Sequence, residues 1–396
     1  MNPSSRFPTA AALLLAASFA FPRLAPAATN APATLPPAPV VAPPATPQPP
    51  PATGPEALQR GLEWLKAQQK PDGSWSDNRY PALTALPLWC FAQSDFPGRE
   101  AIIKKAVDFL LTCSQDDGGF YRNLPGRGGG LSNYNTAICL SALGTLNDPA
   151  LTPVLLKARR FLAAAQYLGD DINSGGMGYD AKSERPYSDL NNTVWTVEAM
   201  RLTEKLEDLR PANTSKADLN WDAVQKYLAR CQNSETSGPS DQGGFSYRPN
   251  ESKAGVQTNA QGVVVFRSYG TMTYAGVLSM IYANMDRSDV RVKSALDWAS
   301  RHWTLEENPG MGAEGQYYFY SILAKALASS GRSDVPVPGK DKPLAWRPAL
   351  TGKLCSLQQA APAKGQGFWI NNAGRWQESD PVLVTSYVIL GLQAAK

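Results

Sequence analysis

"GLEWLKAQQKPDGSW", residues 61 to 75, begins like an amphipathic helix and ends in a glutamine, a turn and a tryptophan. Its order is an aromatic residue and Leu, three further residues, Gln69, and then Gly73 followed by Ser and Trp75. The glycine lets the chain reverse tightly. The Gln amide can form hydrogen bonds with backbone groups left open at helix ends. We interpret this stretch as a structural staple whose aromatic ring covers the junction between neighbouring hairpins.

The same pattern recurs along the chain, with two degenerate copies. "FLLTCSQDDGGF", for example, follows the same order. The key residues of the later copies are Gln115, Gly119 and Phe120; Phe161, Gln166, Gly178 and Tyr179; Tyr227, Gln232, Gly244 and Phe245; Trp303 in place of Gln; and Gln359, Gly367 and Phe368. Each copy is expected to be one outer helix with its turn.

A second helical segment follows each turn and aligns without gaps in all six copies. The segments start at Thr84, Thr136, Thr193, Thr273, Tyr320 and Thr385. Their first, fifth and eighth positions share one helix face, and the fifth and eighth are apolar. The seventh position always holds a small residue, which predicts a close approach between helices.

The sequence therefore predicts six helical hairpins, none of which can bury its apolar stripe alone. Such hairpins stack as an open solenoid or close into a double ring. Neither end copy has a polar outer face suited to capping a solenoid. We therefore expect an all-α fold, the closed α/α toroid of six hairpins, over residues 56–396.

The third and sixth positions of the inner helices share a different face of mixed character, which we expect to line the lumen. Glu198 and Lys325 are the only charged residues in these positions. An isolated carboxylate beside Trp195 would have a raised pKa and could act as an acid. The alternatives are that both charges lie near a wet helix end or pair with each other.

The N-terminal residues predict export. Arg6, an apolar run and a small-residue pattern indicate a signal peptide over residues 1–27, and its apolar run is too short to span a bilayer. A Pro/Ala-rich linker follows over residues 28–55. We therefore expect a secreted or periplasmic protein with no transmembrane segment. The formal net charge of +4 falls to +2 when the two arginines of the signal leave, which gives no indication of nucleic-acid binding.

The cysteines and the single histidine indicate no metal site or cofactor. The five cysteines form no CxxC pair, and we expect small buried residues, with one or two disulfides as the alternative. His302 is the single histidine of the sequence. This argues against a metal site and against a nucleophile activated by histidine.

These Gln-Trp repeats, carried most clearly by "RGLEWLKAQQKPDGSW", resemble those of the squalene-hopene cyclase and prenyltransferase superfamily of α/α toroids. The resemblance covers essentially residues 56–396 and implies the fold rather than the chemistry. The DxDD acid motif of the cyclases is absent, and Asp116 and Asp117 lie in a repeat turn. The zinc ligands of the prenyltransferases and the GCGEQ segment of thioester domains have no counterpart either.

A ligand site is expected where the inner helices begin, because parallel helix dipoles add there and the longest insertions lie there. The candidate ligand-binding residues are Tyr134, Asn135, Asp189, Asn192, Trp195, Tyr269 and Tyr317. The plainer interpretation of the polar ones is helix N-capping. The charged connection "LTEKLEDLRPANTSKADLN" on the opposite face is interpreted as a solvated loop.

Two classes of function follow. The favoured one is a non-catalytic toroid that binds a protein, lipid or envelope ligand at the N-terminal face of its inner helices. The alternative is a divergent enzyme that acts on an isoprenoid, or a carbohydrate-active toroid with Glu198, Asp189 and Asp380 as candidate carboxylates. A deep apolar lumen favours a lipid, a shallow polar groove a glycan, and a plugged lumen a binding module.

Overall fold

The computed structural model describes residues 50–51, 53–124, 130–181, 187–259 and 261–396, which belong to one compact unit. The predicted signal peptide and nearly all of the linker lie outside the described residues. The first helix begins at Gly54, two residues before the expected start of the folded part at Glu56, and Thr53 caps it: the Thr53 hydroxyl accepts the Glu56 N–H at 3.3 Å.

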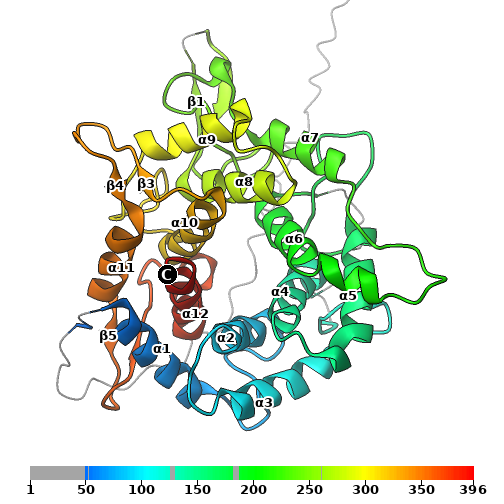
Figure 1. The fold of residues 1–396 in the computed structure, drawn as a ribbon. Coiled ribbons are helices and arrows are strands. Elements are labelled where there is room, and N and C mark those ends of the chain that lie inside the picture. Colours follow the sequence, from blue (N-terminus) through cyan, green and yellow to red (C-terminus); the bar gives the residue numbers. More distant parts are fainter. Residues whose placement is uncertain (1–49, 52, 125–129, 182–186, 260) are drawn as a thin grey trace, which may run out of the picture. The chain divides into compact units, whose positions relative to one another are not determined.

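Six helical hairpins follow one another, as predicted (Figure 1). The outer helices are α1 (Gly54–Gln68), α3 (Arg99–Leu111), α5 (Thr152–Ala165), α7 (Trp221–Cys231), α9 (Val290–Arg301) and α11 (Trp346–Leu357). The inner helices are α2 (Ala82–Ala92), α4 (Ser132–Gly144), α6 (Leu190–Leu202), α8 (Gly270–Tyr282), α10 (Gln316–Ser330) and α12 (Pro381–Ala394).

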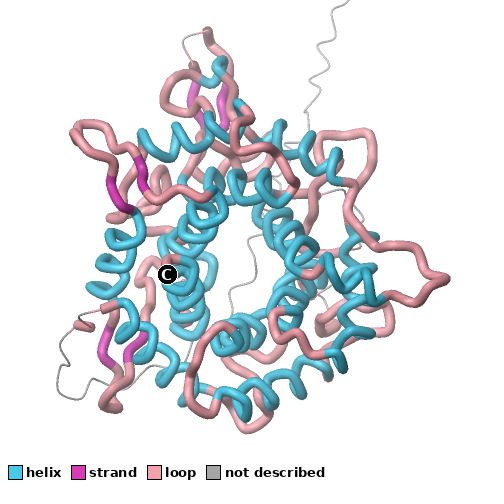
Figure 2. The backbone as a smooth tube through the Cα atoms, viewed as in Figure 1, coloured by secondary structure: helices cyan, strands magenta, loops and turns pink. Residues whose placement is uncertain are grey.

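The ring is closed. Each inner helix packs against the next, and α12 returns to pack against α2, while the outer helix α11 packs against α1. Figure 2 shows the inner helices side by side around the centre, with the outer helices surrounding them. The inner helices are buried around most of their circumference because they lie between the outer ring and the side chains of the lumen. This confirms the closed α/α toroid.

The small residues of the seventh position lie at the seams between inner helices. A Cβ added to Gly391 of α12 would lie 3.5 Å from the Cα of Ser321 of α10. At the closing seam, the Cys90 thiol donates to the Ser386 carbonyl at 3.4 Å. The fifth and eighth positions are fully or almost fully buried in every copy. The pattern therefore predicted both the core face and the close helix contacts.

In copies one, three, four and six, the glutamine of the motif joins its outer helix to the next one, whereas the hydrogen bonds of Gln115 in copy two lie within its own repeat. Gln69 caps α1, and its Nε2 donates to the Gly73 carbonyl at 3.1 Å and to the Ile102 carbonyl of α3 at 3.0 Å. Gln232 does the same with Gly243 and with Arg291 of α9. The glutamine is therefore a link between neighbouring repeats as well as a cap on its own helix.

The threonine that opens the inner segment also has a repeated role. Its hydroxyl oxygen accepts the backbone N–H of the turn residue that enters the hairpin junction. The pairs, with donor first, are Trp75 and Thr84, Phe120 and Thr136, Met177 and Thr193, Phe245 and Thr273, and Trp369 and Thr385. Copy five differs, since the Tyr320 hydroxyl donates to the Leu305 carbonyl at 2.6 Å.

These bonds correct the motif register in two copies. In copy three, Met177 occupies the junction rather than the expected Tyr179, because it is Met177 that bonds to the threonine. In copy six, Trp369 replaces the expected Phe368, and Gln358 rather than Gln359 caps the outer helix. Copy six contains adjacent residues of one type, two glutamines and two aromatic residues, which the spacing alone did not separate, whereas in copy three the junction residue is not aromatic.

The connection after α6 is also different from the expectation. It contains the short 3₁₀ helix η2 (Glu204–Leu209), and Glu207 is only 2 % exposed rather than solvated. Its carboxylate pairs with the fully buried Arg159 of α5 at 2.9 Å. One carboxylate of this charged segment is therefore buried and ion-paired. The sequence pattern alone did not distinguish it from the other charged residues of the segment.

The remaining elements are short. The 3₁₀ helices are η1 (Pro149–Leu151), η3 (Glu235–Ser237) and η4 (Arg375–Gln377). Antiparallel pairs are formed by β1 (Val256–Thr258) with β2 (Val264–Phe266), β3 (Asp334–Val335) with β4 (Leu344–Ala345), and β5 (Gln359–Ala360) with β6 (Gly367–Phe368). The longest insertion thus carries a hairpin, β1–β2. All five cysteines are free and buried, as expected.

Gln358 provides a test of ring closure, because its Nε2 donates to the Ala57 carbonyl of α1 at 2.8 Å and links the last outer helix to the first. Gln358→Ala should lower the free energy of unfolding by about 1 kcal/mol, measured by urea titration. Gln115→Ala is the control, since the Gln115 amide donates to the carbonyls of Cys113 and Tyr121 within its own repeat. If the ring closes here, local opening of α1 measured by hydrogen exchange should increase only in Gln358→Ala.

Candidate functional site

A pocket of about 390 Å³ lies at the end of the ring where the inner helices finish. It is formed by the C-terminal turns of α2, α6, α8, α10 and α12 together with the end of the chain. The lining residues are Trp89, Gln93, Glu198, Leu202, Tyr282, Lys325, Ala328, Ser329, Leu390, Gln393, Ala394 and Lys396. This is the size of a small-molecule site, and the lining mixes apolar, amide and charged groups.

Glu198 and Lys325 meet in this pocket. The Lys325 Nζ lies 2.9 Å from one carboxylate oxygen of Glu198 and 3.0 Å from the other, and the two residues are 9 % and 2 % exposed, respectively. The Tyr282 hydroxyl donates to the same carboxylate at 3.4 Å. The prediction that both charges lie on the lumen face is confirmed. Glu198 is not isolated, because it pairs with Lys325, which was one of the alternatives; a catalytic role for Glu198 stays a prediction.

The Lys325 ammonium group also lies over two indole rings. It is 4.4 Å from the ring centroid of Trp89 and 4.8 Å from that of Trp195. Both rings are almost completely buried, so these cation–π contacts are shielded from water. One positive charge is therefore surrounded by a carboxylate and two aromatic faces.

Aromatic side chains cross the lumen nearer the N-terminal ends of the inner helices. Tyr318 of α10 stacks on Trp195 of α6, with ring centroids 5.9 Å apart, and lies 5.2 Å from Tyr387 of α12. Tyr134 of α4 meets Trp195 edge to face at 6.5 Å. These rings contact one another across the lumen, on the N-terminal side of the charged pair.

The residues expected to form a rim at the N-terminal face are in fact mostly interior. Of the seven, only Tyr134 is partly exposed, whereas the others are buried: Asn135, Asp189, Asn192, Trp195, Tyr269 and Tyr317. The Asn135 side-chain oxygen accepts the Ala82 N–H of α2 at 3.0 Å. Asp189 caps α6 by accepting the Asn192 N–H at 2.8 Å. Asn135 and Asp189 therefore serve as caps, Asn192 donates to the capping Asp189, and a binding role for the set stays a prediction.

The other candidate carboxylate, Asp380, is also a cap. Its side chain accepts the Val382 N–H of α12 at 2.9 Å and a hydrogen bond from the Ser76 hydroxyl. Burial raises the pKa of Asp380. The structure does not bring Asp380 into the pocket with Glu198.

Asp189 has a strongly perturbed environment. Its burial raises its pKa from 3.8 to about 6, against the opposing effect of hydrogen bonds from Asn192. Tyr187 nearby has its own pKa raised to about 12, by burial first and then by the Asp189 charge. The Asp189 carboxyl group therefore takes up a proton near pH 6, while the neighbouring Tyr187 hydroxyl stays neutral.

Asp189→Asn should therefore change how stability depends on pH. Between about pH 4 and 6 the folded protein holds the Asp189 proton while the unfolded chain is ionised, so the wild type loses stability as pH rises through this window. The variant lacks this loss and should be more stable at pH 7 by up to about 3 kcal/mol, with no advantage near pH 4. Urea titrations at both pH values measure it. Parallel pH profiles of the two proteins would contradict the assignment.

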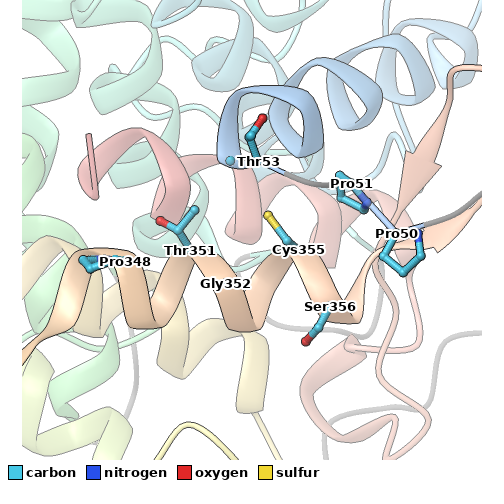
Figure 3. Close-up of a pocket in the computed structure, with 9 residues that line it drawn as sticks. Pro50, Pro51, Thr53, Pro348, Thr351, Gly352, Cys355 and Ser356 are labelled. Carbon is cyan, nitrogen blue, oxygen red and sulfur yellow. The ribbon is translucent and has the colours of Figure 1, made fainter.

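A second pocket of about 400 Å³ lies between the start of α1 and the outer helix α11 (Figure 3). Its lining is neutral, with Pro50, Pro51, Thr53, Gly54, Pro348, Thr351, Gly352, Cys355 and Ser356. The thiol of Cys355 has its pKa raised by burial. This pocket has fewer groups for chemistry than the central one.

The repeat pattern also predicts the lining of the central pocket, but only if the inner segments are aligned beyond their eighth position. Position ten lies one turn beyond position six on the same helix face. In five of the six copies, position ten lines the pocket: Gln93, Leu202, Tyr282, Ser329 and Ala394. The alignment of eight positions ended two residues before the position that lines this pocket.

No family model matches the sequence, and no curated protein matches it. Solved structures do match. A variant of the type II terpene cyclase MstE from Scytonema, in complex with geranylgeranyl dihydroxybenzoate, has a TM-score of 0.52 and 12% identity, over 86% of this chain and 97% of that one. A complex of a second MstE variant with merosterolic acid A has a TM-score of 0.51 at the same identity and coverage. A geranylgeranyltransferase-I from Candida albicans has a TM-score of 0.44 and 12% identity, over 75% of this chain and 89% of that one.

The fold is thus that of a terpene-cyclase-like α/α toroid, and at this identity the likeness concerns the fold alone. Within the described ranges, no helix is both long and apolar enough to cross a bilayer. The same residues contain no group of three or more His, Cys, Asp or Glu side chains that could hold a metal ion.

Proposed function

We propose that this chain is a ligand-binding toroid that holds a small molecule in its central pocket, at the C-terminal end of the inner helices. The observation that carries the proposal is the pocket of about 390 Å³ into which Trp89, Glu198 and Lys325 converge from three inner helices. Concave sites of this size with a few placed polar groups are where proteins bind small ligands.

The location differs from the N-terminal face favoured by the sequence. The candidate residues there are buried, and Asn135 and Asp189 form hydrogen bonds within the fold, so little of their polar surface is open to a ligand. In the central pocket, by contrast, Gln93 is exposed and Ser329 is partly exposed. Trp195 and Tyr318 stack on each other within the lumen, on the N-terminal side of the charged pair. The partly exposed polar lining supports binding at the C-terminal end.

The role proposed is non-catalytic, because the DxDD motif is missing and Glu198 is held by Lys325. A second candidate is acid-initiated chemistry on an isoprenoid, which the raised pKa of Asp189, about 6, favours. The MstE substrate in the matching structure carries a geranylgeranyl group. Incubation with geranylgeranyl diphosphate and a geranylgeranyl arene separates the candidates: a cyclised product lost in Asp189→Asn supports the enzyme.

We also propose that the chain is exported, on the basis of the signal-like residues 1–27 and the Pro/Ala tract that follows. N-terminal sequencing of the mature protein tests this. A first residue close to position 28 supports export, whereas an intact N-terminus contradicts it.

A blocked pocket tests the binding function. The protein is purified from its own host and studied by native mass spectrometry for a bound small molecule. Ser329→Trp places an indole in the pocket lining and should remove the ligand. Ser288→Trp is the matched control, since Ser288 is exposed in the loop after α8 and the same ring there should leave the ligand bound. Equal occupancy in both variants would contradict the proposal.

A further inference from the structure

The central pocket is a cation cage occupied by the chain's own lysine, and we propose that its ligand carries an alkylammonium group that displaces Lys325. This inference rests on the proposed binding function and adds the chemical class of the ligand. It follows from what surrounds the Lys325 ammonium in the pocket rather than from the fold.

The cage has the composition that recognises an ammonium ion. Trp89 and Trp195 present their ring faces at 4.4 and 4.8 Å, and Glu198 supplies a carboxylate at 2.9 Å. Indole faces are the strongest aromatic partners of cations, and desolvation strengthens the attraction. Both tryptophans are at most 2 % exposed, so the ammonium group rests on dry aromatic surface.

The position of the cage within the fold also favours positive charge. It lies where the inner helices end, and helix C-termini carry partial negative charge. The Gln393 side-chain oxygen, which belongs to the pocket lining, is buried with no hydrogen-bond partner among the described residues. The pocket thus offers a further acceptor to a ligand that donates hydrogen bonds.

Lys325 is a tethered competitor in this arrangement. It reaches the cage from α10, and it lines the same pocket as Ala328 and Ser329, which are partly exposed at the mouth. A ligand ammonium can enter when the lysine side chain moves toward the mouth. The apparent affinity for the ligand is then the intrinsic affinity multiplied by the fraction of molecules in which the lysine has left the cage. Removal of the lysine charge should therefore tighten binding.

The experiment titrates choline into the full chain and follows the change in tryptophan fluorescence. Choline should bind the wild type, and Lys325→Met should bind it at least about tenfold more tightly. The neutral carbon isostere 3,3-dimethylbutan-1-ol should bind neither protein. Equal signals for choline and the isostere would overturn the inference, because binding would then depend on shape and not on charge.

Two further variants keep the test decisive if Lys325→Met does not fold. Trp89→Leu retains the Lys325–Glu198 pair and should weaken choline binding at least about tenfold, relative to the wild type, because one face of the cage is lost. Trp376→Leu is the matched control, since this indole is 39 % exposed and lies outside the pocket. Unchanged choline binding in Trp89→Leu would overturn the cage.

The source of the ammonium group is resolved by a third probe. A lysophosphatidylcholine below its micelle concentration shares the choline head but adds a chain. Tighter binding than choline assigns the ligand to a lipid headgroup, and equal or weaker binding assigns it to a free amine; both results support the cage.

Failure of the inference is distinguishable from failure of the proposed function. A neutral or anionic molecule that Ser329→Trp removes, with no response to choline, would leave the binding function in place and overturn the cation cage. A protein that carries no ligand and responds to none of the probes would count against both.

Discussion

Trp75→Ala is expected to lower the free energy of unfolding by about 3–5 kcal/mol, the range for a buried large aromatic residue. Trp75 is completely buried. Its indole N–H donates to the Leu65 carbonyl at 2.7 Å near the end of α1, and its ring stacks on Phe91 of α2 with centroids 6.3 Å apart. Alanine would leave a cavity at the hairpin junction and an unpaired carbonyl.

Urea-induced unfolding followed by circular dichroism measures the loss. Trp376→Ala is the matched control, because the same residue type is 39 % exposed there, and it should cost less than about 1 kcal/mol. Similar losses in the two variants would mean that the motif tryptophan is not the junction that the repeat pattern indicates.

Arg159→Met should be about equally costly, at roughly 3–5 kcal/mol, because it strands a buried carboxylate. The guanidinium group binds Glu207 at 2.9 Å, the Met200 carbonyl at 2.7 Å and the Ala217 carbonyl at 3.1 Å. It thus fastens the connection after α6 to the outer helix α5. Methionine fills a similar volume but satisfies none of these groups.

The double variant Arg159→Met/Glu207→Gln separates charge from packing. If the buried charge causes the loss, the double variant should recover a large part of the stability of the single one in the same urea titration. A double variant as unstable as the sum of both changes would show that the contacts with the backbone carbonyls, rather than the ion pair, stabilise this connection.

The fold was predictable from the sequence because periodicity reports burial directly. Small residues such as Cys90 and Gly391 mark the seams between inner helices, and Gln69 marks the link between outer helices. The register was less certain where two residues of one type are adjacent. Gln358 and Gln359 fit the spacing equally well, and only the hydrogen bond from Gln358 to Ala57 distinguishes them.

The site was harder to predict, for two physical reasons. Polar residues at helix N-termini look the same whether they cap a helix or bind a ligand, and Asp189 is a cap. The pairing of Glu198 with Lys325 joins helices α6 and α10 across the lumen, and a repeat pattern gives the face of each residue but not its partner. The lumen face of both charges was predicted correctly; the pocket lies at the opposite end of the ring from the expected binding site, whose role stays a prediction.

Electron density from crystals of the protein grown with its co-purified ligand is the most direct test of the central claim. The account predicts density for a small molecule in the pocket formed by Trp89, Glu198 and Lys325 at the C-terminal ends of the inner helices. Density located instead among Tyr134, Asn192 and Tyr269, at the N-terminal ends, would contradict the account.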